Sequence, residues 1–241
     1  MPTPAPASHV KSAGRRQRAD GARSRQAILK AATELATVEG LDGLSIARLA
    51  EHVGMSKSGL FAHFKSKEDL QIATIDAAAE LYDREVTQPG MAAPPGVARV
   101  EGQCEAFFSY LERGVLQGGC FFVAAAAEFD AKPGPVKDHL RGVYAGLLAA
   151  LTNVVREARA IGEIAATEDV DQLTFDLDAL LLAANFAFVF FGDPVALERA
   201  RRGVRERLER AAPSGRRVKP TAIAGVRRLG PSRQPAGAGS R

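Results

Sequence analysis

The sequence predicts an all-α protein, and three observations support that prediction. Apolar residues recur every three or four positions along most of the chain, no stretch shows the sustained alternation of a strand, and Gly- and Pro-rich breaks separate the periodic segments. With 241 residues, of which 46% are hydrophobic, the chain is long enough to bury a sizeable core. We expect about nine helices, arranged as a small N-terminal domain and a larger second domain.

The first periodic segment predicts a helix from about Ser24 to Val38. Residues 1–21, before it, are rich in Pro, Ala, Ser and Arg without periodicity, and we predict a disordered basic arm there. Gly40 closes the helix. Its apolar positions follow helical spacing: Ala27, Ile28, Ala31, Ala32, Leu35 and Ala36. We expect this face to pack against the segment that follows.

Residues 45–64 predict two short helices joined by a tight corner. One helix spans about 46–52 and the other about 57–63. Each is preceded by a serine, Ser45 and Ser56, whose hydroxyl can cap free amide groups. Gly54, between the helices, allows the left-handed backbone that ends the first one. This spacing is typical of a helix-turn-helix.

The second of these short helices presents a small and basic surface. Its apolar side chains share one side, which leaves Lys57, Ser58, Gly59 and His63 facing outward. None of these four positions holds a carboxylate, and the N-terminus of the helix adds partial positive charge. Such a surface favours close approach to a polyanion.

The stretch from Ser45 to Leu70 resembles the DNA-binding domain of the TetR family of transcriptional regulators. The positions that carry the resemblance are Ser45, Ala50, Gly54, Ser56, Leu60, His63, Phe64, Lys67, Glu68 and Leu70. Phe61 stands where the family usually has a Tyr whose hydroxyl reaches a phosphate. The resemblance implies a three-helix DNA-binding domain over residues 22–82 and double-stranded operator DNA as the partner. The residues expected to contact DNA are Arg25, Ser45, Ser56, Lys57, Ser58, Gly59, Phe61, His63, Phe64 and Lys67.

A fourth helix is predicted from Ser66 to about Val86, with Ser66 and Asp69 forming a capping box. Residues 87–96 are rich in Pro and Gly and predict a loop. Further helices are expected over residues 97–113, 120–129, 135–160, 170–191 and 195–211. The resemblance implies that residues 83–211 form the ligand-binding and dimerisation domain.

Aromatic residues gather in this second domain. The TetR resemblance implies a cavity among its middle helices for a small inducer. The expected lining is Phe107, Phe108, Tyr110, Phe121, Phe122 and Tyr144. Few charged residues share these segments, so we predict that the inducer is apolar or aromatic.

The segment 170–191 is apolar nearly all round. One apolar face includes Leu177 and Leu181, and Leu182, Phe186, Val189 and Phe190 form a second one. A helix of this kind must be covered on every side. The resemblance implies a homodimer in which the last two helices of each subunit form a four-helix bundle, and such a dimer reads a palindromic operator. The predicted interface residues are Leu177, Leu181, Phe188, Val204 and Leu208.

Basic residues concentrate at the two ends of the chain. Residues 1–25 hold six Lys or Arg against one Asp, and residues 212–241 hold seven against none. We predict that residues 212–241 form a disordered basic tail. These ends either add phosphate contacts that carry no sequence information or remain solvated.

Other sequence features set the expected location and the absence of cofactors. Cys104 and Cys120 form no disulfide framework, and no Cys or His spacing indicates a metal site. The most apolar run, residues 179–191, is shorter than the roughly 20 residues of a membrane span. We therefore expect a cytoplasmic, nucleoid-associated protein without a metal, a cofactor or a membrane partner.

The favoured function is a ligand-responsive repressor that a small inducer releases from its operator. Two alternatives remain: an architectural DNA-binding protein without a ligand, and a regulator that senses oxidants through Cys104 and Cys120. No basic residue adjoins either cysteine to activate it. An enzyme is disfavoured, because the four histidines are scattered and no catalytic motif is present.

Overall fold

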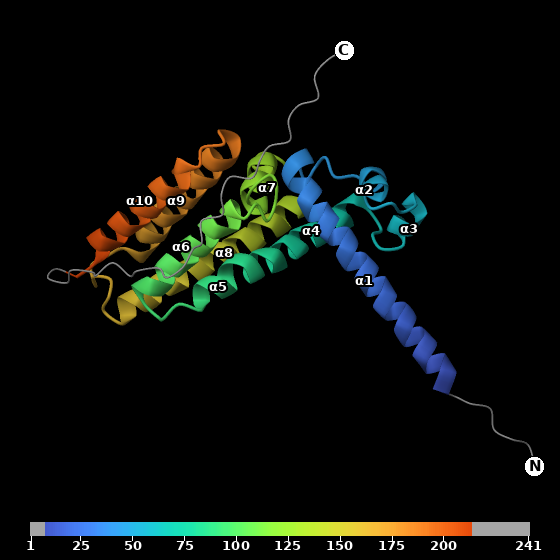
Figure 1. Ribbon diagram of the computed structural model, residues 1–241, viewed down its shortest axis with the longest axis horizontal. Helices are drawn as coiled ribbons and strands as arrows, with labels where there is room; N and C mark the ends of the chain where they lie inside the picture. The colour runs from blue at the N-terminus through green and yellow to red at the C-terminus, as the bar shows by residue number, and fades with distance from the viewer. Residues whose placement is uncertain (1–7, 214–241) are drawn as a thin grey trace, which may run out of the picture.

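The computed structural model describes residues 8–213, and every regular element in that range is a helix (Figure 1). The elements are α1 (Ser8–Glu39), α2 (Ile46–His52), α3 (Lys57–Phe61), α4 (Lys67–Tyr82), the π-helix η1 (Asp83–Thr87), α5 (Gln88–Met91), α6 (Val97–Glu112), α7 (Phe121–Phe129), α8 (Pro135–Ala160), α9 (Val170–Phe190) and α10 (Val195–Ala211). Because α4, η1 and α5 follow one another without a break, the described range contains nine separate helical rods. The predicted all-α class is confirmed.

The first helix begins well before its predicted start at Ser24. α1 is helical from Ser8, so the expectation of disorder is wrong for residues 8–21. This stretch lacks an apolar period, but Ala, Lys, Arg and Gln are good helix formers and extend the packed helix that follows. Figure 1 shows the start of α1 projecting away from the other helices. The disorder predicted for residues 1–7 and 214–241 falls outside the described range.

The head consists of α1, α2, α3 and the start of α4, packed around one apolar cluster. Its fully buried members are Ile28, Leu41, Leu44, Leu49, Leu60, Phe64 and Leu70. Ser45 and Ser56 cap α2 and α3, because their hydroxyl oxygens accept from the backbone N–H groups of Arg48 and Gly59, both at 3.1 Å. Gly54 adopts the left-handed conformation at the corner, with φ +67°. The predicted helix-turn-helix is present.

A single rod leads from the head into the body. It consists of α4, η1 and α5, which continue one another (Figure 1). The loop predicted over residues 87–96 is therefore wrong for residues 87–91, and the break falls over residues 92–96. Pro89 lies inside this continuous rod, where it has no N–H to donate to the backbone hydrogen bonds. The π turn of η1 leads directly into α5.

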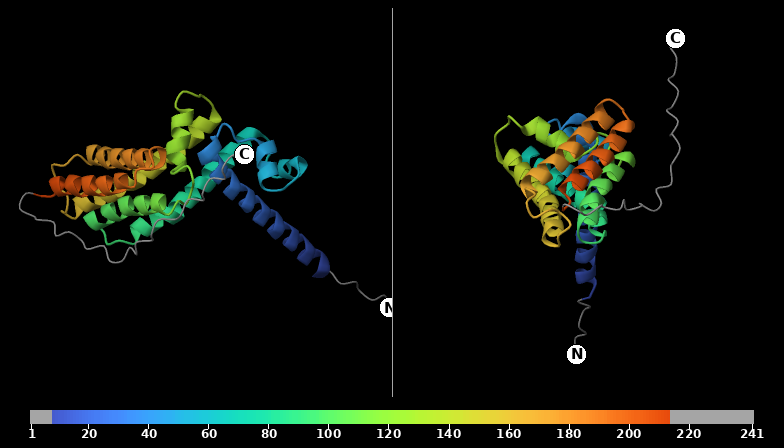
Figure 2. Two further views of the ribbon diagram at one scale, coloured as in Figure 1. Left: turned by 45° about the horizontal axis from the view of Figure 1, so that its top comes forward. Right: turned by 90° about the vertical axis from the view of Figure 1, so that its left-hand side faces the viewer.

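The body is a bundle aligned with the long axis of the molecule. α5, α6, α8, α9 and α10 run along it, and α7 lies where the body meets the head (Figures 1 and 2). α9 and α10 pack directly on each other and on α6. Each of these helices therefore has a buried face inside the subunit.

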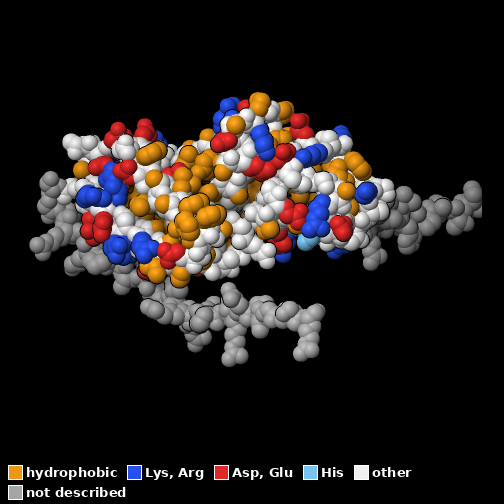
Figure 3. Space-filling model, turned by 90° about the horizontal axis from the view of Figure 1, so that it is seen from above, with side chains coloured by type: hydrophobic (Ala, Val, Ile, Leu, Met, Phe, Trp, Pro, Cys, Tyr) orange, Lys and Arg blue, Asp and Glu red, His pale blue; other side chains and the backbone are white. Residues whose placement is uncertain are grey.

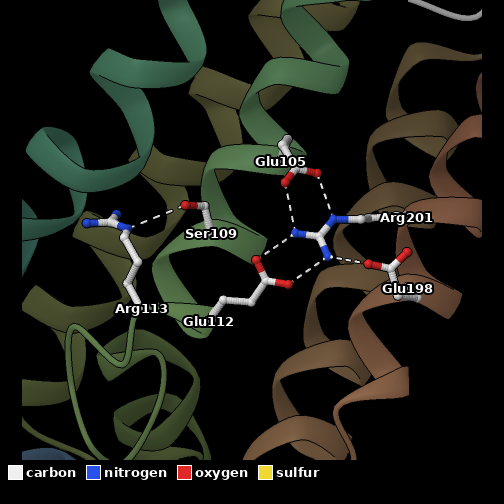
Figure 4. Close-up of polar contacts among 6 residues, drawn as sticks. All are labelled: Glu105, Ser109, Glu112, Arg113, Glu198 and Arg201. Atoms are coloured by element: carbon white, nitrogen blue, oxygen red, sulfur yellow. Dashed lines mark hydrogen bonds and ion pairs between the residues drawn. The ribbon is translucent and has the colours of Figure 1, made fainter. Parts of the chain in front are cut away.

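Arg201 fixes α10 to α6. Its guanidinium donates two hydrogen bonds to Glu105, each 2.8 Å, and further bonds to Glu112 at 2.8 and 3.0 Å (Figure 4). It also lies over the ring of Phe108, 5.4 Å from the centroid. Its side chain is 12% exposed. These carboxylates hold the pKa of Arg201 above its usual value although burial acts against them.

The predicted dimer residues lie on the inner side of the bundle. Leu177, Leu181, Val204 and Leu208 are buried within the subunit, and Phe188 packs partly against the same core. For the four buried residues the assignment to a dimer surface is wrong, because in an antiparallel helix pair this face closes the chain's own core. For the half-buried Phe188 it stays a prediction. The opposite face of α9 is the open one. Its exposed large side chains are Phe175, Phe186, Val189 and Phe190.

This open face is strongly apolar. Phe186 and Phe190 are 53% and 72% exposed and stack on each other, with ring centroids 5.1 Å apart. Figure 3 shows apolar side chains gathered over the middle of the body, between groups of charged ones. By length and hydropathy α9 would suffice to cross a membrane, although part of it is core in this fold. A surface of this kind on a globular body indicates a contact that a single subunit leaves open.

Candidate nucleic-acid interface and ligand cavity

The N-terminal tip of α3 carries most of the exposed residues predicted to contact DNA. Lys57, Ser58 and Phe61 are exposed, and Gly59 is half-buried. The hydroxyls of Ser56 and Ser58 lie 3.1 Å apart, so one donates to the other and the accepting hydroxyl keeps its own hydrogen to donate outward. The tip therefore presents hydroxyl donors, a lysine and an exposed ring on the first turn of a helix.

Phe64 lies outside this surface. The structure buries its ring completely in the core of the head, so its assignment to DNA contact is wrong. Phe61, three residues earlier, is 54% exposed and takes the outward position instead. The guanidinium of Arg25 stacks 5.2 Å from the Phe64 ring, which places this exposed arginine of α1 beside α3.

Lys67 is the first residue of α4. Its ammonium group lies 3.2 Å from Asp42, and Lys132, at the end of α7, contacts the other oxygen of Asp42 at 3.2 Å. These two hydrogen bonds hold the pKa of Asp42 below its usual value. The side chain of Lys67 stays 50% exposed. Ser45 and His63, the remaining predicted phosphate contacts, are half-buried at the ends of α2 and α3.

A cavity opens in the body between the α4–η1–α5 rod and helices α6, α7, α8 and α9. Its water-accessible volume is about 40 Å³, inside a recess of about 600 Å³ that includes open solvent. The walls are Tyr82, Thr87, Gln103, Phe107, Cys120, Phe122, Val123, Tyr144, Leu147, Leu148, Ala150, Leu151, Asp178, Leu181 and Leu182. The mainly apolar walls, with a few polar groups among them, are typical of a site for a small molecule.

Half of the predicted lining residues meet at this cavity. Phe107, Phe122 and Tyr144 line it, and the rings of Phe122 and Tyr144 stack at 6.2 Å. The other predicted residues, Phe108, Tyr110 and Phe121, are buried but lie outside the lining. Neighbouring residues on a helix face different directions, so only one ring of each adjacent pair reaches the space.

Sequence reasoning missed the polar members of the lining. Tyr82 and Thr87 come from the rod that was thought to end near this point, and Gln103 donates to the backbone carbonyl of Thr87 at 3.0 Å. Asp178 comes from α9. Its signal was present in the sequence, because it is a carboxylate within an otherwise apolar helical run.

The two cysteines are unsuited to redox sensing. Both are buried free thiols, and Cys120 lies at the cavity wall. Burial raises the pKa of Cys104 to about 12 and the pKa of Cys120 to about 11, so both remain protonated at neutral pH. Since the thiolate is the reactive form, this geometry argues against the thiol-sensor alternative.

Comparison with known proteins agrees with this layout. Residues 28–74 match the family model described as bacterial regulatory proteins, tetR family, and residues 96–204 match the tetracyclin repressor-like C-terminal domain. TcmR, an HTH-type transcriptional regulator from Streptomyces glaucescens, is 27% identical over 207 residues, which cover 77% of this chain and 89% of TcmR.

Solved structures share the fold. A TetR transcriptional regulator from Chloroflexus aurantiacus superposes with a TM-score of 0.74 at 26% identity, over 80% of this chain and 98% of that one. The structure of AibR in complex with isovaleryl coenzyme A and operator DNA superposes with a TM-score of 0.60 at 19% identity, over 78% of this chain and 98% of that chain.

Proposed function

Because this chain belongs to the TetR family of transcriptional regulators, we propose that it is a homodimeric repressor. It binds a palindromic operator and dissociates from it when a small inducer binds. The observation that carries the proposal is the rod formed by α4, η1 and α5. Lys67 at one end of it lies in the head, and Tyr82 and Thr87 further along it line the cavity. One rigid element thus joins the two candidate sites.

The DNA-binding part of the proposal rests on the tip of α3. Lys57, Ser58 and Gly59 are assigned to the major groove, where a helix N-terminus presents its first side chains to base edges. Ser45, Ser56, His63 and Lys67 are assigned to phosphates, with Arg25 beside them. Phe61 is assigned to an apolar contact, since its exposed ring lacks a hydroxyl to donate.

The ligand-sensing part of the proposal rests on a shift between two arrangements of the rod. A molecule that fills the cavity contacts Tyr82 and Thr87. It stabilises the position of α4 in which the molecule and the cavity walls share the larger contact area. Such a ligand can change operator affinity only by its difference in affinity for the two arrangements, typically about 1 to 3 kcal/mol. AibR, which shares the fold, has been crystallised with a coenzyme A thioester and operator DNA.

The dimerisation part of the proposal rests on the open face of α9. Phe175, Phe186 and Phe190 repeat at helical spacing on that face and are more than half exposed. A second copy related by a two-fold axis covers them with the same residues. The two heads then lie about one helical repeat of DNA apart, roughly 34 Å or a multiple of it. The expected setting is the cytoplasm, on the nucleoid.

The proposal is tested by titrating the protein against a pool of palindromic duplexes and a pool of scrambled duplexes. We expect selective enrichment of a palindrome, bound by two subunits, and weaker binding when a small molecule that raises the melting temperature is added. A protein that binds both pools equally would act as an architectural binder. A protein whose palindrome affinity no stabilising molecule changes would lack the sensing function.

A further inference from the structure

One polar feature of the cavity remains unexplained by an apolar inducer. Asp178 lies in its wall, and within the described part of the chain its carboxylate has no hydrogen-bond or salt-bridge partner. The lining that the structure describes contains no Lys, Arg or His. Glu105 and Glu112 on α6, by contrast, are both paired with Arg201. Asp178 therefore stands out as a carboxylate that the fold itself leaves unused.

The field of Asp178 acts on the whole cavity. Burial raises the pKa of Asp178 above its usual value, and no nearby positive charge opposes the shift. Burial is the main cause that raises the pKa of Tyr82, Tyr144, Cys104 and Cys120, and the negative charge of Asp178 adds a smaller contribution to each. Among the described residues that line the cavity, no cation offsets the negative charge that Asp178 carries when ionised.

Aromatic faces surround the same space. Tyr82 and Phe122 meet edge to face at 5.9 Å, and Phe122 stacks on Tyr144 at 6.2 Å. Aromatic faces attract cations through the ring quadrupole, and a carboxylate next to them supplies the full counter-charge. In the described structure the hydroxyls of Tyr82 and Tyr144 also lack a hydrogen-bond partner, which leaves two further acceptors for an N–H group.

We infer that the inducer is an organic cation, in which an ammonium or amidinium group sits at Asp178 between Tyr82 and Tyr144 and an apolar or aromatic body fills the space toward Leu147 and Leu151. The inference rests on the proposed function, since it concerns the same cavity. Asp178 is half-buried. An unpaired, partly desolvated carboxylate is costly in the empty protein, and a cation that occupies the cavity reduces that cost. The cavity thereby selects for positive charge.

Two probes of equal shape test the charge preference. Benzyltrimethylammonium carries the charge, and neopentylbenzene replaces its nitrogen by carbon. We expect the wild-type protein to bind the cation at least tenfold more tightly than the neutral probe, by calorimetry or thermal shift. In Asp178→Asn this ratio should fall to about one. Asp171→Asn, an exposed carboxylate on the same helix, is the matched control and should keep the wild-type ratio.

A second measurement needs no ligand. Because the raised pKa of Asp178 means that its ionisation opposes folding, the empty protein should lose stability as the pH rises through that pKa. Asp178→Asn should therefore melt at the same or a higher temperature than wild type at pH 7, whereas a carboxylate with a structural role would lower the melting temperature when replaced.

The outcomes separate the inference from the proposed function. Equal binding of both probes by wild type, or a charge preference that survives in Asp178→Asn, would overturn the cation and leave the cavity as a ligand site. Failure of both probes to bind at millimolar concentration would overturn the inference alone, because the sensing function is tested separately by the duplex titration with any stabilising molecule.

Discussion

The carboxylate of Glu128 accepts a hydrogen bond from the backbone N–H of Leu41 at 2.7 Å, although 87 residues separate the two in sequence. Its other oxygen accepts from the N–H of Asp42 at 2.9 Å. Glu128 lies on α7, whose first turn reaches the cavity, and Leu41 lies in the loop between α1 and α2. Gly40 makes this contact possible, because it has φ +86° and a Cβ there would lie 2.9 Å from the carboxylate. The body thus holds the head at a second point besides the rod.

Replacing Glu128 should weaken this second connection between the body and the head. In Glu128→Gln one of the two backbone N–H groups faces the side-chain NH2, which cannot accept a hydrogen bond. We therefore expect a loss of about 1.5 kcal/mol in the free energy of unfolding. Hydrogen exchange should rise in residues 40–44 more than in the body. Asp130→Asn, an exposed carboxylate two residues away, is the control and should change neither quantity. Unchanged exchange in Glu128→Gln would show that the contact does not restrain the loop.

The two lysines of the head should have separable roles. Lys67→Ala should weaken binding to every duplex alike and reduce the slope of log affinity against log salt by about one, because a single phosphate contact is lost. Lys57→Ala should instead change the preferred sequence. Fluorescence anisotropy on the enriched palindrome and on a scrambled duplex, over a range of salt concentrations, measures both effects. Identical losses on both duplexes for the two variants would contradict this division.

The open face of α9 should hold the dimer together. Phe186→Glu places a charge on the apolar stripe, so we expect a monomer by analytical ultracentrifugation, with unchanged helix content and much weaker binding to the palindrome. Val38→Glu changes an equally exposed apolar residue of the head and should remain dimeric. A monomeric wild-type protein, or a dimeric Phe186→Glu, would place the interface elsewhere.

The thiols should be inert in the folded protein. With pKa values of about 12 for Cys104 and about 11 for Cys120, the thiolate fraction at pH 8 is negligible, and iodoacetamide should label neither residue without denaturant. Hydrogen peroxide should leave operator binding unchanged. If peroxide releases the DNA and the double variant Cys104→Ala, Cys120→Ala does not respond, the thiol-sensor alternative would be restored.

Arg201 should contribute more to stability than its neighbour. Arg201→Met leaves Glu105 and Glu112 facing each other without a counter-charge, and we expect a loss of about 3 kcal/mol in the free energy of unfolding. Arg202→Met removes an exposed arginine whose closest carboxylate, on Glu206, lies 3.8 Å away. Its effect should stay within about 0.5 kcal/mol. Chemical denaturation of both variants compares them directly, and equal losses would show that the Arg201 cluster adds no net stability.

Local signals in the sequence predicted the head and most helix boundaries. The capping serines and Gly54 act within a few residues, so Ser45, Ser56 and the corner between α2 and α3 appear where they were expected. The rod was cut short in the prediction, because Pro89 and Gly90 are helix breakers on average and only the packing of α5 on α6 decides otherwise.

The site was harder to predict than the helices. Phe64 and Phe61 both fit the head pattern, but which ring faces outward depends on how α3 packs on α1 and α2. Likewise, both faces of α9 are apolar in sequence, and the choice between Leu177 and Phe186 as the outer residue depends on which face meets α10. Long-range packing of this kind leaves no mark in a local pattern.

The π turn of η1 also decides which side chains the rod turns inward. Tyr82 and Thr87 are five positions apart, and at about 100° per residue a regular α-helix would place them roughly 140° apart around the axis. The hydrogen-bond spacing of a π-helix is five residues, so one wide turn brings them nearly into line, and both line the cavity. η1 therefore lets the rod carry one residue more than a regular helix while both side chains still face the cavity. Removing one residue from this turn would restore ordinary α-helical geometry and leave the two side chains four positions apart, about 40° around the axis, so the extra residue is absorbed without rotating the head away from the body.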